Sequence, residues 1–157
     1  MNDFEPYKIF QLIDRGNQQQ EKGWIDAADL QQFLEHHYIQ AKENELEELI
    51  AEFDSDEDGR LSFDEFQMMM LPSTNLNLRT IAQMRKNSML LVDQKASYEV
   101  ESMVARLVNR EMEYHKKRES NRRALLKCED FNKYTGFEAM AGDHSEITVK
   151  DMINFFD

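Results

Sequence analysis

Residues 54–65 form an acidic stretch in which oxygen-bearing groups recur at alternate positions. Counting Asp54 as position 1, the donors at positions 1, 3, 5, 7, 9 and 12 are Asp54, Asp56, Asp58, the backbone carbonyl of Arg60, Ser62 and Glu65. Oxygen ligands at this spacing, closed by both oxygens of a glutamate, suit Ca2+. Gly59 at position 6 can turn the chain through positive φ at little cost. The stretch predicts one calcium site, with a solvated acidic turn as the alternative.

Helices must flank this loop to hold its ligands, and apolar residues at helical spacing lie on both sides of it. They are Leu46, Leu49, Ile50 and Phe53 before the loop, and Phe63, Phe66, Met69 and Met70 after it. The pattern also occurs earlier, so residues 1–71 are predicted to form two helix–loop–helix units. Leu61, at position 8 of its loop, lies 36 residues after Ile25. We expect these two residues to form a short antiparallel bridge that joins both units into one lobe.

The earlier loop lacks the carboxylates of a calcium site. With Ile25 as position 8, positions 1, 3, 5, 6 and 12 are Gln18, Gln20, Lys22, Gly23 and Asp29. In a second register Asp14 is position 1, which requires four inserted residues before Ile25. In either register an aspartate at position 12 is less able than a glutamate to reach an ion with both oxygens. The first loop is therefore predicted to be empty and kept for packing.

The chain after the lobe changes character at Pro72, since proline cannot continue a helix. Residues 72–96 are expected to form a linker with a short helix over 76–86 and a break near Asn87 or Ser88. Residues 97–135 predict a long charged helix, about 35 to 40 residues if unbroken. Its faces are mostly polar, so it is expected to bridge bodies or lie along a partner rather than be buried.

This predicted helix carries a run of basic side chains. They are Lys116, Lys117, Arg118, Arg122, Arg123 and Lys127. The run is either a solvated helix face or a docking patch for an acidic surface.

Residues 136–157 predict a third, degenerate unit of the same kind. With Ile147 at position 8, positions 1, 3, 5 and 12 are Met140, Gly142, His144 and Asp151, a set that should not hold calcium. Thr148 and Asp151 can cap the helix that follows. Because such units normally pair, we expect either that the chain is a fragment or that this unit pairs with another molecule.

Composition excludes several classes of function. Residues 1–71 carry 18 acids and 5 bases, whereas residues 72–157 carry 13 and 14. The acidic half argues against nucleic acid and for cations or basic targets. No apolar run is long enough to span a membrane, and one cysteine fits a reducing compartment, so a cytoplasmic protein is expected. No nucleophile and base are arranged as catalysis requires, so no enzymatic activity is expected.

On residues 54–65 the chain resembles the EF-hand superfamily, and residues 1–71 resemble a lobe of calmodulin-like proteins. The resemblance implies an all-α fold with an EF-hand pair and bound Ca2+. It also implies a methionine-rich groove for an amphipathic target helix, to which residues 68–70 would contribute, although core filling is an equal alternative. In layout the whole chain is similar to multi-EF-hand proteins of protist cilia.

Three functions fit these features. The first is a structural or adaptor component of a cytoskeletal assembly, with the ciliary axoneme as the specific case. The second is a calcium sensor that opens its groove for a target helix. The third is a regulatory segment of a larger enzyme. The expected partner is thus a protein, either a target helix or a filamentous assembly, and neither nucleic acid nor a membrane.

Overall fold

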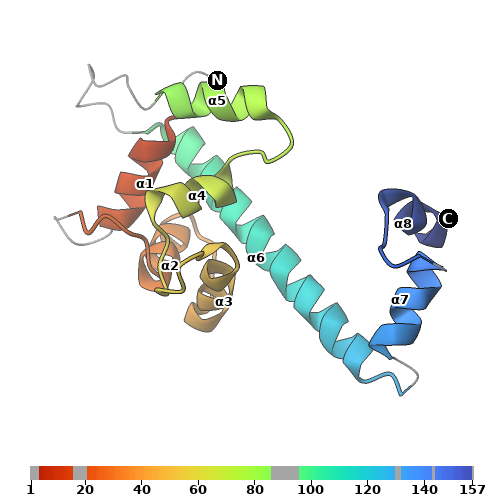
Figure 1. Ribbon diagram of the computed structural model, residues 1–157. Coiled ribbons are helices and arrows are strands. Elements are labelled where there is room, and N and C mark those ends of the chain that lie inside the picture. The colour runs from red at the N-terminus through yellow and green to blue at the C-terminus, as the bar shows by residue number, and fades with distance from the viewer. Residues whose placement is uncertain (1–3, 16–20, 86–95, 130–131, 143, 157) are drawn as a thin grey trace. The chain divides into compact units, whose positions relative to one another are not determined.

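The computed structural model describes residues 4–15, 21–85, 96–129, 132–142 and 144–156. The regular secondary structure of the described residues is helical, with one isolated β-bridge and no strand. This confirms the all-α prediction (Figure 1). The helices are α1 Pro6–Arg15, α2 Ala27–His36, α3 Glu43–Phe53, α4 Phe63–Met70, α5 Leu76–Met84, α6 Tyr98–Leu126, α7 Lys133–Ala141 and α8 Val149–Phe156. The chain divides into two compact units, Met1–Lys116 and Lys117–Asp157.

Helices α1 to α4 form the predicted lobe. Helix α1 packs against α2 and α4, and α3 packs against the same two helices. The inward side chains are almost completely buried, among them Ile9, Ile13, Leu30, Leu34, Leu46, Leu49 and Phe66. Each such side chain contributes roughly 1.5–3 kcal/mol through removal of apolar surface from water. The apolar spacing read from the sequence therefore corresponds to the core that holds the two loops.

The two loops of the lobe meet at the predicted bridge. Ile25 and Leu61 exchange both backbone hydrogen bonds, with N–O distances of 2.9 and 2.8 Å. Both side chains are fully buried. Two backbone hydrogen bonds and two buried side chains therefore join the two loops.

Helix α6 is shorter than predicted and is partly buried, contrary to expectation. It contains 29 residues and ends at Leu126, and α7 begins after Asn132, whose side chain accepts a hydrogen bond from the Tyr134 N–H at 2.9 Å. Residues in its first half join the core of the lobe, namely Val100, Val104, Ala105, Val108 and Met112. The prediction failed because a narrow apolar stripe is enough to bury one side of an otherwise polar helix.

Helix α5 spans Leu76–Met84, close to the predicted 76–86, and its N-cap Asn75 accepts a hydrogen bond from the Leu78 N–H at 3.1 Å. The predicted break near Asn87 and Ser88 lies outside the described residues. Among the helices that are described, none is both long and apolar enough to cross a membrane.

The second unit contains α7 and α8, which pack against each other. Thr148 and Asp151 form the predicted cap, in which the Thr148 hydroxyl and N–H donate to Asp151 Oδ2 at 2.6 and 2.8 Å. These hydrogen bonds lower the pKa of the Asp151 carboxyl. Asp151, at position 12 of the third loop, is therefore engaged in holding the start of a helix.

Candidate calcium site

The loop of residues 54–65 is anchored by the helices on either side of it. Asp54 is the C-cap of α3, and its N–H donates to the Ile50 carbonyl. Ser62 is the N-cap of α4 and forms a reciprocal capping box with Glu65. Predicted ligand positions 1, 9 and 12 are thus fixed at helix ends.

The three aspartates predicted as ligands lie together. Within the described part of the chain, Asp54, Asp56 and Asp58 are the one group of three acidic, histidine or cysteine side chains whose ligand atoms all lie within 4.8 Å of one another. Asp54 accepts hydrogen bonds from the Asp58 N–H at 3.2 Å and from the Gly59 N–H at 2.7 Å. Gly59 has φ of +79°, the left-handed conformation for which glycine was expected at position 6.

Glu65 extends back into the loop from the first turn of α4. Its Oε1 accepts from the Ser55 N–H at 2.7 Å, and its Oε2 accepts from the Ser62 N–H at 2.9 Å and the Ser62 hydroxyl at 2.7 Å. The Ser62 hydroxyl is the main cause of a lowered pKa of Glu65. The carboxylate is therefore held by hydrogen bonds near both ends of the loop, outside the group formed by Asp54, Asp56 and Asp58.

The charges of the aspartates oppose one another. The negative charge of Asp58 raises the pKa of Asp56. Burial pushes the pKa of Asp54 upward, but the N–H groups of Gly59 and Asp58 outweigh it and the pKa is lowered. Converging carboxylates that repel one another are relieved by a bound cation, and their hard oxygens suit Ca2+. The donor set therefore fits this ion.

Arg60 at position 7 connects the two loops through its side chain. Its guanidinium carbon lies 4.5 Å from the centre of the Trp24 ring, and the backbone N–H of Arg60 donates to Asp58 Oδ1 at 2.9 Å. The side chain thus faces the first loop, which leaves the backbone carbonyl as the group that position 7 would supply to an ion.

The first loop has the hydrogen-bond pattern of the second, with a lysine in it. Asp14 is 1% exposed and accepts from the N–H groups of Lys22 and Gly23, both at 2.9 Å. This matches Asp54 with Asp58 and Gly59, so the hydrogen bonds favour the register that makes Asp14 position 1. Gln18 and Gln20 of the other register lie outside the described residues.

The Lys22 ammonium occupies the acidic end of this loop. Its Nζ lies 2.8 Å from Asp26 Oδ2 and 2.6 Å from Asp29 Oδ2, the side chains at positions 9 and 12. Burial lowers the pKa of Lys22, but the two carboxylates prevail and raise it. Sequence reasoning noted this lysine only as a missing ligand. A basic residue at position 5 with acids at positions 9 and 12 was the signal that a built-in cation would pair with them.

Comparison with known proteins agrees with this geometry. Residues 7–71 match the family described as an EF-hand domain pair. Troponin C of Tachypleus tridentatus is 41% identical over 63 residues, which are 40% of this chain and 39% of that protein. Troponin C isoform 2 of Caenorhabditis elegans is 41% identical over 64 residues, 40% of this chain and 37% of that protein. The matched region spans about two fifths of each curated relative.

Proposed function

We propose that the lobe binds one Ca2+ ion in its second loop. The premise is that residues 7–71 are an EF-hand domain pair in a calmodulin-like, calcium-binding protein. The proposed ligands are Asp54, Asp56, Asp58, the carbonyl of Arg60, Ser62 and Glu65. The first loop is proposed to hold no calcium, because the Lys22 ammonium already pairs with both Asp26 and Asp29.

One observation carries this assignment. Asp54, Asp56 and Asp58 converge within 4.8 Å, and Glu65 accepts hydrogen bonds from Ser55 and Ser62 of the same loop. With three aspartates and a glutamate, an affinity on the order of 10⁻⁷ to 10⁻⁵ M is expected for such a loop.

Calorimetric titration with Ca2+ in millimolar magnesium tests the proposal. The native chain should bind one ion, and Glu65→Gln should weaken binding at least about tenfold because the closing bidentate ligand is lost. Asp64→Asn is the matched control, since this carboxylate is adjacent in sequence but hydrogen-bonds the Gln67 amide at 3.2 Å. Equal affinity of Glu65→Gln and the native chain would refute the ligand set.

We further propose that the protein acts as a structural or adaptor component of a cytoplasmic, cytoskeletal assembly, the ciliary axoneme being the specific case. The support is that Lys22 fills the first loop and that α6, a long and mostly polar helix, shares the core of the lobe. Retention of a tagged chain in the detergent-resistant fraction of ciliated cells is the expected result. Complete extraction by detergent would refute it.

The second candidate is a calcium sensor, favoured by Met68, which is 55% exposed beside the buried Met69 and Met70. A sensor would expose apolar surface when calcium binds, which an environment-sensitive dye such as ANS detects. A calcium-dependent rise in dye fluorescence that Glu65→Gln abolishes would select the sensor over the structural role.

A further inference from the structure

The first half of α6 lies on the lobe as a packed helix. Its buried side chains are between 0% and 4% exposed, namely Val100, Val104, Ala105, Val108 and Met112. They belong to one cluster with the core of α1 to α4. Four of the five recur every fourth residue, so they form a single stripe along the helix. Over residues 98–116 the side chains of this stripe are buried as completely as the core side chains of α1 to α4.

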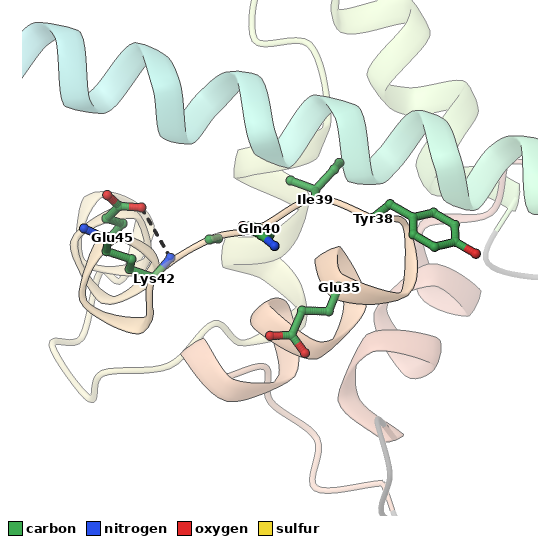
Figure 2. Close-up of a pocket in the computed structure, with 7 residues that line it drawn as sticks. Glu35, Tyr38, Ile39, Gln40, Lys42 and Glu45 are labelled. Carbon is green, nitrogen blue, oxygen red and sulfur yellow. Dashed lines mark hydrogen bonds between the residues drawn. The ribbon is translucent and has the colours of Figure 1, made fainter.

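The segment between α2 and α3 contributes to the surface under α6. In Figure 2 the side chain of Ile39 points toward the α6 ribbon, while the Glu35 side chain points away from it. Ile39, Ala41 and Leu107 are partly buried and pack against the same cluster. The connection between the two helix–loop–helix units is therefore part of a helix-binding face.

Side-chain contacts lie at both ends of this docked segment. At its start the Tyr98 ring lies 5.4 Å from the buried His37 ring, whose pKa is lowered by burial, so that the nearby Glu101 forms no ion pair with it at neutral pH. Toward its end His115 Nδ1 lies 2.8 Å from Glu52 Oε2, and Lys116 Nζ lies 2.8 Å from Glu45 Oε2. The polar contacts to α3 hold this end of the helix.

The acidic partner at the far end is α3. This eleven-residue helix carries Glu43, Glu45, Glu47, Glu48 and Glu52. An incoming helix that places a basic side chain over α3 is thus favoured by charge, and Lys116 meets that requirement.

We propose that residues 98–116 are a built-in ligand that closes the helix-binding face of the lobe. The external partner of this face is then an amphipathic helix of the same chemistry, with apolar residues every fourth position and basic residues in its last turn. Such a helix binds only by displacing α6. Because the internal segment is present at a high effective concentration, it suppresses binding of an equivalent free helix. This inference rests on the packing of α6 and not on the ion ligands of residues 54–65.

Displacement by a free peptide tests the proposal on the full chain in calcium-free buffer. The probe is a fluorescent peptide of residues 98–116, followed by anisotropy. The variant Val104→Asp/Val108→Asp buries two carboxylates in the stripe and should release α6, so that it binds the peptide at least about tenfold more tightly than the native chain. Met103→Asp is the matched control, because Met103 is 39% exposed on the same helix, and it should bind like the native chain.

The uncharged variant Val104→Ala/Val108→Ala serves if the charged one does not fold, and it should also bind more tightly than the native chain. Equal peptide affinity of the native chain and these variants, including no binding by any of them, overturns the proposal.

Hydrogen exchange of the native chain gives a second readout. Amides of residues 102–116 should exchange at least about tenfold more slowly than those of residues 121–126, which are exposed in the same helix. Equal exchange in both segments overturns the docked arrangement.

Discussion

Replacement of Lys22 by methionine removes the cation inside the first loop and keeps most of the volume of the side chain. The ammonium contacts Asp26 and Asp29 at 2.8 and 2.6 Å, and the side chains of Lys22 and Asp29 are 18% and 11% exposed. Breaking an exposed ion pair costs about 0–1 kcal/mol, and breaking a buried one about 3–5 kcal/mol. For this mostly buried group we expect a loss of about 2 kcal/mol in the free energy of unfolding.

Urea denaturation followed by circular dichroism measures this change, and thermal unfolding should show a midpoint lower by roughly 8 °C for a unit of this size. Lys8→Met is the control, because Lys8 pairs at 3.1 Å with the single carboxylate of Glu5, and these side chains are 28% and 22% exposed. It should cost less than about 1 kcal/mol.

The double variant Lys22→Met/Asp29→Asn separates the ion pair from simple loss of packing. Burial raises the pKa of Asp29, and the nearby Asp26 charge raises it further, so Asp29 is costly to keep ionised without the lysine. Neutralising Asp29 should recover about half of the lost stability. If Lys22→Met destabilises no more than Lys8→Met, the ammonium does not take the place of an ion in this loop.

Three further predictions concern the second loop. Gly59→Ala should destabilise the lobe by about 1–2 kcal/mol in urea denaturation, because the backbone at this position has φ of +79°. The cost is conformational and not steric, since nothing lies within 4 Å of an added Cβ. Gly59→Asn should cost less, because asparagine adopts this conformation more readily than alanine. The Ser62 hydroxyl lowers the pKa of Glu65 in the folded protein from its ordinary 4.5. The ionised Glu65 therefore stabilises the fold fully above pH 4.5, and this stabilisation should be lost as the pH falls through the lower pKa of the folded state. An unfolding midpoint that does not change below pH 4.5 would contradict this prediction. Arg60→Leu should remove the cation stacked on Trp24 and alter its fluorescence by an amount that Arg60→Lys partly restores.

The second loop could be predicted closely because its determinants are local. The spacing of Asp54, Asp56 and Asp58 and the glycine at position 59 lie within a few residues, and the helix caps follow the same local rules. The bridge between Ile25 and Leu61 was also predicted, since position 8 of each loop can be counted along the sequence. The ligand roles of these residues remain predictions.

Features that depend on distant contacts could not be predicted in this way. The burial of Val104 and Val108 requires an apolar face on the lobe to receive them, and the apolar stripe of the helix does not reveal in its own sequence which surface covers it. The end of α6 at Leu126 was missed because neither glycine nor proline marks it. The role of Asp14 in the first loop was left open between two registers, and only its hydrogen bonds from the Lys22 and Gly23 N–H groups decide between them.

The lysine in the first loop also bears on the form of the response to calcium. In a lobe with two ion-binding loops joined by a bridge, filling one loop prepares the other, and the binding curve steepens. Here one loop carries its own permanent positive charge at any calcium concentration. Calcium occupancy of the lobe should therefore rise with calcium concentration along a simple hyperbolic curve with a Hill coefficient of one. Such a curve gives a graded change in occupancy over a wide range of calcium concentration and no abrupt threshold.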